Sequence, residues 1–418
     1  MKTPNVYARS RCMPGGSSTR KNQCARTAAL VFAVGLLIVF VSPYAAQAQT
    51  TEKIIFTFDR TDGGSPQSVP LLDAQGNIYG TTLFGGTFDS GVVFKLSPSG
   101  GEKIIYNFKG KDVGYPNGLI HDSTGNLYGT GTRGGTVGAG SVFKIDKTGK
   151  ETILHSFRGS PNDGEAPQAA LVRDTASNLY GTTLFAGIYG FGTVFRISRS
   201  GIEKVLYNFT GGADGAYPYS NLILDAVGNL YGTTTYGGPY GNGTAGFGTV
   251  FQLDTSGNET VLYAFLGGAD GAYPAGGLVR DSSGNLYGST NNGGSASGCD
   301  TQFECGTVFE VDTSGKETVL HSFGSAGDGK GPQGNLILDE AHNLYGATFD
   351  GGTFQSGTVF KLDPSGNETV LYNFGTNPGD GGLPRAGLVR DAAGNLYGTT
   401  EGGGCCGGYG IVFELTFP

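Results

Sequence analysis

The stretch from Gly387 to Thr400 reads Gly-Leu-Val-Arg-Asp-Ala-Ala-Gly-Asn-Leu-Tyr-Gly-Thr-Thr, and close variants of it occur seven times in the 418 residues. Each copy is followed by a glycine-rich segment and then by Gly-Thr-Val-Phe or a close variant. The tyrosines of the seven copies are spaced by 49, 52, 51, 56, 58 and 52 residues; they are Tyr79, Tyr128, Tyr180, Tyr231, Tyr287, Tyr345 and Tyr397. A period near fifty residues, built from strand-sized pieces, is typical of a radial β-structure.

One repeat, residues 277–323, divides into four short strands. Residues 278–281 are followed by Ser-Ser-Gly-Asn, a sequence typical of a hairpin turn, and residues 285–290 form the second strand. A longer loop with two glycines leads to the third strand, residues 306–311, and residues 317–323 alternate apolar and polar side chains as a fourth. Four antiparallel strands joined by short turns predict the blade of a β-propeller.

The fourth strands are displaced along the sequence relative to the other three strands of each repeat. Residues 52–58 read Glu-Lys-Ile-Ile-Phe-Thr-Phe, which is a fourth-strand sequence, and the last repeat ends at Pro418 directly after its third strand. The sequence therefore predicts an all-β, seven-bladed propeller over residues 51–418, in which the N-terminal strand completes the last blade. Such closure leaves no unpaired strand edge in the ring.

The first 48 residues have a different composition. They contain six basic residues and no acidic residue, an uncharged run of 14 residues from Ala28 to Val41, and the sequence Ala46-Gln47-Ala48. These features predict a signal peptide cleaved after Ala48. The alternative is an uncleaved membrane anchor, although about 20 apolar residues are needed to span a bilayer. Both interpretations predict an extracytoplasmic protein, either secreted or periplasmic.

Charge and cysteine content restrict the partners further. Beyond residue 48 the chain has 21 basic and 35 acidic residues, a net charge of −14. This charge disfavours nucleic acid as a partner and limits membrane contact to an uncleaved N-terminal segment. Cys299 and Cys305 share one loop and are a candidate disulfide in an oxidising compartment. For the adjacent Cys405 and Cys406, a vicinal disulfide and free thiols both stay open.

The loops predict where a ligand binds. Two loop types are long and variable, and propeller geometry places both on one end of the ring, where function usually lies. The candidate binding residues on this face are Tyr115, Tyr217, Tyr236, Tyr273, Asp214 and Asp270. Aromatic rings stack on the apolar faces of sugars, and carboxylates accept hydrogen bonds from hydroxyl groups. The alternative interpretation is that Asp-Gly pairs form ordinary turns and that the aromatic side chains pack between blades.

Signatures of catalysis are absent from the sequence. No nucleophile elbow, zinc-protease motif, phosphate loop or dinucleotide motif is present, so we expect no catalytic residue, cofactor or metal site. The four histidines are interpreted as structural, and Glu165, Glu304 and Glu401 as solvated loop charges. The favoured function is a non-catalytic binding or scaffold module for a glycan or protein. The alternatives are a polysaccharide lyase or hydrolase and a structural protein of the cell envelope.

Two stretches carry a resemblance to a known family. They are the phrase from Gly387 to Thr400 and the segment Gly-Thr-Val-Phe-Lys-Leu-Asp-Pro-Ser-Gly-Asn-Glu-Thr-Val-Leu-Tyr-Asn-Phe from Gly357 to Phe374. Both resemble the Gloeobacter/Verrucomicrobium tandem repeat of exported bacterial proteins, over residues 51–418. The resemblance implies an extracytoplasmic repeat protein, without a reaction, cofactor or catalytic residue. More distant similarity to NHL, streptogramin-lyase-like and kelch propellers supports the fold more than any function.

Overall fold

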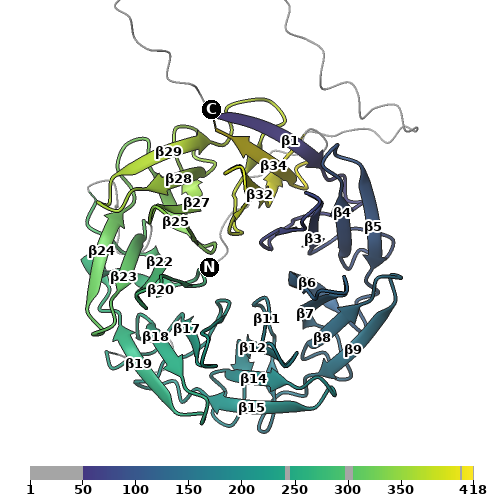
Figure 1. Ribbon diagram of the computed structural model, residues 1–418, viewed down its shortest axis with the longest axis vertical. Coiled ribbons are helices and arrows are strands. Elements are labelled where there is room, and N and C mark those ends of the chain that lie inside the picture. The colour runs from purple at the N-terminus through teal and green to yellow at the C-terminus, as the bar shows by residue number, and fades with distance from the viewer. Residues whose placement is uncertain (1–49, 241–244, 297–304, 405–406, 418) are drawn as a thin grey trace, which may run out of the picture. The chain divides into compact units, whose positions relative to one another are not determined.

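The computed structural model describes residues 50–240, 245–296, 305–404 and 407–417. Within the compact unit Ala48–Pro418, these residues form seven antiparallel sheets arranged in a ring (Figure 1). The predicted all-β, seven-bladed propeller is thereby confirmed. The described residues contain no α-helix, and hence none with the length and hydropathy needed to cross a membrane.

Each sheet is one blade, and its strands follow one another from the central channel outward to the rim. The innermost strands are β2 (Leu71–Leu72), β6 (Gly114–His121), β11 (Val172–Arg173), β16 (Ile223–Leu224), β21 (Val279–Arg280), β26 (Ile337–Leu338) and β31 (Val389–Arg390). The second strands are β3 (Ile78–Thr82), β7 (Leu127–Arg133), β12 (Leu179–Thr183), β17 (Leu230–Thr234), β22 (Leu286–Asn292), β27 (Leu344–Gly351) and β32 (Leu396–Thr400).

The outer half of each blade is equally regular. The third strands are β4 (Val92–Leu96), β8 (Ser141–Ile145), β14 (Thr193–Ile197), β18 (Thr249–Leu253), β23 (Thr307–Val311), β28 (Thr358–Leu362) and β34 (Ile411–Thr416). The outermost strands are β5 (Glu102–Asn107), β9 (Glu151–Ser156), β15 (Glu203–Asn208), β19 (Glu259–Ala264), β24 (Glu317–Ser322), β29 (Glu368–Asn373) and β1 (Thr51–Thr57).

Short extra elements lie in the long loops. Two two-stranded sheets pair β10 (Gly164–Glu165) with β13 (Phe185–Ala186) and β30 (Gly381–Gly382) with β33 (Gly402–Gly403). β20 (Ala272–Pro274) and β25 (Gly329–Pro332) extend two blades, and η3 (Gly268–Asp270) is a turn of 3-10 helix.

The outer strand of the seventh blade comes from the other end of the chain. β1 pairs antiparallel with β34, in a register that runs from Thr51 opposite Thr416 to Thr57 opposite Ile411. Figure 1 shows β1 lying outside β34 at the rim. The segment that the sequence analysis assigned to the last blade therefore occupies that position.

The glycine after the tyrosine of the repeated phrase is required by an aromatic ring on the neighbouring strand. Gly80 lies directly opposite Phe94 in the register of β3 and β4. A Cβ atom at Gly80 would lie only 2.5 Å from the Phe94 ring, a separation that real Cβ atoms do not adopt. This close approach explains why Tyr-Gly on the second strand always accompanies Val-Phe on the third.

The same phenylalanines join the blades to one another. The phenylalanine that directly follows each outer strand packs edge-to-face on the third-strand phenylalanine of the next blade, with ring centroids 5.0–5.2 Å apart. The pairs are Phe58–Phe94, Phe108–Phe143, Phe157–Phe195, Phe209–Phe251, Phe265–Phe309, Phe323–Phe360 and Phe374–Phe413. Because each pair buries two rings at a blade interface, the core is a closed circle.

The Asp-x-x-Gly-Asn-Leu-Tyr hairpin is held by its own side chains. In the first blade, the Asn77 amide donates to Asp73 Oδ2 at 2.8 Å, and the Tyr79 hydroxyl donates to the same oxygen at 3.1 Å. Burial raises the pKa of the Asp73 carboxyl, but these hydrogen bonds outweigh it and leave the pKa below its ordinary value. The corresponding aspartate, asparagine and tyrosine of every other blade make the same contacts.

Six of the seven innermost strands have only two residues, fewer than the sequence predicts; the exception is β6, which begins in the link at Gly114. Residues 278–281 were expected to form a full strand, whereas β21 has two residues. Neighbouring blades meet here, and side chains replace part of the backbone ladder: the Gly277 N–H donates to Asn335 Oδ1 at 2.8 Å, and the Ala170 N–H donates to Asn221 Oδ1 at 2.7 Å.

Candidate binding surface on the long-loop face

The links between blades carry three of the four predicted tyrosines, Tyr115, Tyr217 and Tyr273, in an unusual backbone conformation. The residue before each link proline has a positive φ of 51–63° in all seven links; these residues are Ser65, Tyr115, Ala166, Tyr217, Tyr273, Gly331 and Leu383. Positive φ is uncommon outside glycine. Its sevenfold occurrence identifies it as part of the scaffold. The Tyr217 N–H donates to the Phe191 carbonyl at 2.9 Å, and the Tyr273 N–H to the Phe247 carbonyl at 2.9 Å, so each link is tied to the preceding blade.

Three of the four predicted tyrosines come together. Tyr217 and Tyr236 have ring centroids 5.9 Å apart, and Tyr236 and Tyr273 are 5.0 Å apart. Phenylalanines extend the contacts at both ends, at 5.5–6.0 Å. We call these six residues the aromatic row: Phe185, Phe191, Tyr217, Tyr236, Phe247 and Tyr273. Phe185 is 42% exposed and the three tyrosines are partly exposed, whereas Phe191 and Phe247 pack against the hydrophobic core and anchor the row.

Tyr115, the fourth predicted tyrosine, lies outside this row. Its ring packs edge-to-face on Phe84 at 5.6 Å, and the Arg133 guanidinium lies 5.4 Å from its centroid. It therefore forms a separate aromatic contact at another blade.

The two predicted aspartates are oriented toward the outer strands. Asp214 accepts hydrogen bonds from the Tyr207 hydroxyl at 3.0 Å and from the Thr210 N–H at 2.7 Å. Asp270 accepts from the Tyr263 hydroxyl at 2.5 Å and from the Leu266 N–H at 2.7 Å. These contacts close the links, as the turn interpretation expects, and both carboxylates are directed away from the aromatic row.

The structure adds a ring of residues that sequence reasoning did not single out. The residue after each link proline lines the central channel; these residues are Gln67, Asn117, Gln168, Tyr219, Ala275, Gln333 and Arg385. We call them the channel ring. Four of the seven carry carboxamides, which both donate and accept hydrogen bonds. The available signal was a polar residue after most of the repeated prolines, but sequence alone did not show that these residues face one another.

The channel ring contains one ion pair. Arg385 Nε donates to Glu401 Oε2 at 2.9 Å, and its guanidinium lies 4.6 Å from the centroid of Phe349. Tyr219 is 40% exposed to the channel, and its pKa is raised because the surrounding protein disfavours the phenolate. Glu401, interpreted from sequence as a solvated loop charge, is thus held in place by Arg385.

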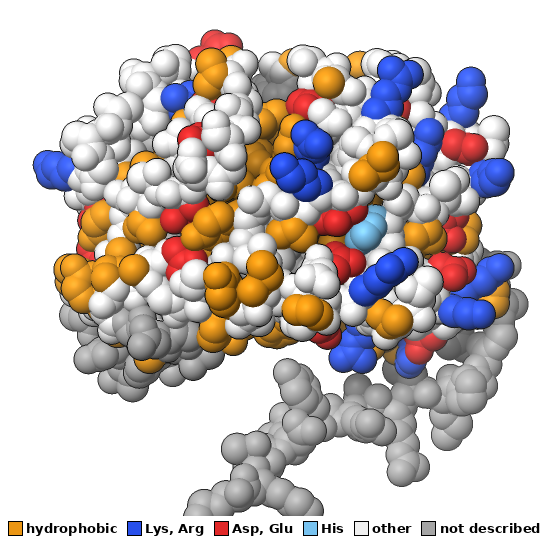
Figure 2. Space-filling model, turned by 90° about the horizontal axis from the view of Figure 1, so that it is seen from below, with side chains coloured by type: hydrophobic (Ala, Val, Ile, Leu, Met, Phe, Trp, Pro, Cys, Tyr) orange, Lys and Arg blue, Asp and Glu red, His pale blue; other side chains and the backbone are white. Residues whose placement is uncertain are grey.

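Glu165 borders this surface, because it lies opposite Phe185 of the aromatic row in the register of β10 and β13. Glu165 is exposed on β10, while Glu304 and Cys299 lie outside the described residues. Cys305 is buried, and its disulfide with Cys299 stays a prediction. On the side of the ring seen in Figure 2, acidic and basic side chains alternate with apolar ones.

The repeat pattern also matches a known family along nearly all of the chain. The model of the Gloeobacter/Verrucomicrobia repeat matches residues 40–245 and 240–413. The chain belongs to the Gloeobacter/Verrucomicrobia repeat family. The resemblance inferred from the two quoted stretches is therefore confirmed. No curated protein matches this repeat-family chain significantly.

Solved structures support the fold of this repeat-family propeller. A streptogramin B lyase superposes with a TM-score of 0.58 at 11% identity, covering 88% of this chain and 98% of the other. The extracellular domain of a hybrid two-component system of B. thetaiotaomicron gives 0.58 at 10% identity, covering 88% of this chain and 39% of that one. A gluconolactonase of Xanthomonas campestris gives 0.45 at 14% identity, covering 90% and 94%. At these identities the likeness to the first two structures shows the fold alone.

The seven Gloeobacter/Verrucomicrobia repeats provide an internal comparison. The hairpin aspartates, the Phe–Phe pairs and the positive-φ links occur in every repeat and therefore maintain the fold. The aromatic row lies only on the third to fifth blades, and the Arg385–Glu401 pair only on the seventh. These local departures from the repeat are the candidate functional features of the described residues.

Proposed function

We propose that this chain is an extracytoplasmic, non-catalytic binding module that holds a glycan on the long-loop face of its propeller. The N-terminal sequence pattern and the extracellular location named for a structural neighbour support export. The observation that carries the proposal is the aromatic row beside the channel ring. Tyr217 belongs to the row and Tyr219 to the ring, and only Pro218 separates them, so the two features are continuous.

The chemistry of the two features is complementary. The aromatic row offers ring faces to the C–H faces of successive sugars, and the carboxamides of the channel ring can donate to and accept from sugar hydroxyls. The Gln168 and Gln333 carboxamides line the channel, and no protein hydrogen bond to them is found among the described residues. Because the exported part has a net charge of −14, a neutral glycan is favoured over an acidic one.

The binding surface is tested by removing the rings that make it. Replacing Tyr217, Tyr236 and Tyr273 together by Ala should weaken binding to the best soluble polysaccharide at least about tenfold, since each stacking contact contributes about 0.5–1.5 kcal/mol. Affinity electrophoresis and calorimetry against β-glucan, xylan, galactomannan and starch provide the measurement.

A matched control uses tyrosines on the same face but outside the row. Tyr189 and Tyr240 are 55% and 60% exposed, and their replacement by Ala should leave binding unchanged. Unaltered binding by the triple variant would refute this surface. Release of shorter sugars from the polysaccharide would instead favour the lyase or hydrolase alternative. Binding to envelope proteins without any glycan would favour a protein ligand or an envelope scaffold.

A further inference from the structure

Each blade interface near the rim contains the same three positions. They are the link aspartate, a residue of the outer strand in the same blade, and the first glutamate of the next outer strand, which approaches from the neighbouring blade. In three blades the outer-strand residue is a tyrosine whose hydroxyl donates to the link aspartate: Tyr207, Tyr263 and Tyr372. In a fourth blade Tyr106 donates instead to Glu151 of the next outer strand, and the seventh blade has Phe56 at this position. In two blades it is a histidine, His155 or His321. The replacement of tyrosine by histidine places an imidazole nitrogen beside the carboxylates of the link aspartate and the glutamate.

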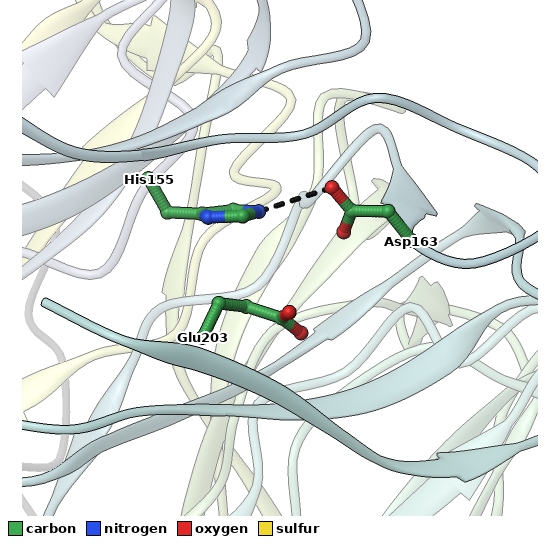
Figure 3. Close-up of side chains that lie close together, drawn as sticks. All are labelled: His155, Asp163 and Glu203. Carbon is green, nitrogen blue, oxygen red and sulfur yellow. Dashed lines mark hydrogen bonds and ion pairs between the residues drawn. The ribbon is translucent and has the colours of Figure 1, made fainter.

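The histidine interfaces have the geometry of a cation site. His155 Nε2 lies 3.1 Å from Asp163 Oδ2, and His321 Nε2 lies 3.2 Å from Asp328 Oδ2. Glu203 lies beside the first pair, as Figure 3 shows. One ligand atom each from His155, Asp163 and Glu203 lie within 4.8 Å of one another. Ligands bound at 2.0–2.2 Å around a tetrahedral ion are about 3.4 Å apart. The His155–Asp163 separation of 3.1 Å is close to this value, and the Glu203 ligand atom lies within 4.8 Å of both.

The aspartates are positioned by the backbone in the manner expected of metal ligands. Asp163 is 8% exposed and accepts hydrogen bonds from the Arg158 N–H at 2.9 Å and the Gly164 N–H at 2.7 Å. Asp328 is 6% exposed and accepts from the Gly324 and Gly329 N–H groups at 3.1 and 2.6 Å. Such outer contacts fix the orientation of a ligating carboxylate.

The third ligand of each set is a glutamate with a buried oxygen that has no protein partner. Oε1 of Glu203 and Oε1 of Glu368 are buried and accept no hydrogen bond from the protein. Glu259 and Glu317 at tyrosine interfaces have the same unpaired oxygen, but a tyrosine hydroxyl provides no nitrogen ligand. The two carboxylates of each interface match the charge of one divalent ion, and among the described residues the two histidine interfaces add an imidazole nitrogen to them.

We propose that His155, Asp163 and Glu203, and likewise His321, Asp328 and Glu368, each bind one first-row divalent cation of the Zn²⁺ type. One imidazole and two carboxylates are ligands that Zn²⁺ accepts, leaving one position for water. Glu203 and Glu368 belong to the blade that follows their histidine and aspartate, so each ion clamps two neighbouring blades. The sequence analysis expected no metal site because the three ligands are far apart in sequence.

The test uses the full chain, stripped with EDTA, dialysed and loaded with Zn²⁺. Elemental analysis and calorimetry should give two ions per chain, falling to one in His155→Tyr or His321→Tyr and to none in the double variant. These variants restore the tyrosine that other repeats carry, so they should fold. Zn²⁺ should raise the melting temperature of the wild type by about 3 °C or more and leave that of the double variant unchanged.

A reciprocal variant tests whether the three positions suffice. Tyr207→His places an imidazole beside Asp214 and Glu259, and should create a third ion site. Glu203→Gln keeps the side-chain shape and should reduce the number of bound Zn²⁺ ions by one. It replaces His155→Tyr in the test if that variant is unstable. A wild type without stoichiometric Zn²⁺, or a double histidine variant that still binds two ions, would overturn the proposal. A Tyr207→His chain that binds only two ions would contradict the sufficiency of these ligands.

Discussion

Deleting residues 51–58 is expected to abolish the cooperative fold of the whole ring. β1 makes the outer strand of the seventh blade, and Phe58, which is completely buried, packs on Phe94 of the first blade. Truncating one such phenylalanine costs about 3–5 kcal/mol, whereas a folded domain is stable by only about 5–15 kcal/mol. The deletion also exposes the edge of β34, so the variant should lose its sharp thermal transition or precipitate. Scanning calorimetry measures this directly.

Two variants separate the causes of that loss. Replacing residues 51–58 by a Gly-Ser segment of equal length keeps the chain length and should destabilise as severely as the deletion. Phe58→Ala keeps β1 and should lower the melting temperature by less. A deletion variant that melts at the wild-type temperature would mean that β1 does not close the ring.

Raising the pH from 5 to 8 in the presence of EDTA should lower the melting temperature by about 5 °C or more. The pKa values of Glu52, Glu259 and Glu317 are raised to about 7, chiefly because burial disfavours the carboxylate, and further by the charge of a link aspartate. The facing groups are Asp380 and Tyr372 for Glu52, Asp214 and Tyr207 for Glu259, and Asp270 and Tyr263 for Glu317.

The sign of the effect follows from proton binding. Between the ordinary pKa of a glutamate, about 4.3, and the raised value, the unfolded chain releases a proton that the folded chain retains, so stability falls as the pH rises. Solvent screening at these half-buried groups reduces each contribution to about 1 kcal/mol, and three groups together give the expected shift.

Stability should also fall at low pH, for the opposite reason. Hydrogen bonds lower the pKa of the hairpin aspartates despite their burial, so their contribution is present above about pH 4 and is lost as they become protonated. The stability maximum is therefore expected near pH 5.

Amide variants test the origin of the pH dependence. Glu259→Gln combined with Glu317→Gln should flatten the decline between pH 5 and 8, because the amide does not ionise. A wild type whose melting temperature rises over this range would refute the assignment, as would an unchanged slope in the double variant.

The repeat period, the strand-sized pieces and the displaced fourth strand predict the architecture without any coordinates. This succeeds because a blade is a local structure: its hairpins, the Gly80–Phe94 contact and the Asp73–Asn77–Tyr79 contacts all form within one repeat. Counting the copies then predicts the number of blades. The tyrosines of the long loops were also found from sequence, because aromatic side chains are unusual in otherwise polar segments.

Contacts between repeats were beyond the reach of the sequence. The rotation of neighbouring blades about the ring axis decides whether Tyr217 and Tyr236 lie beside Tyr273. It also decides which residues face the channel beside Arg385. His155 and Glu203 are 48 positions apart and meet only because adjacent outer strands lie side by side. The repeated phrase thus decides the shape of each blade, whereas the packing of blade on blade decides which side chains can act together, since those distances exist only once the ring is closed.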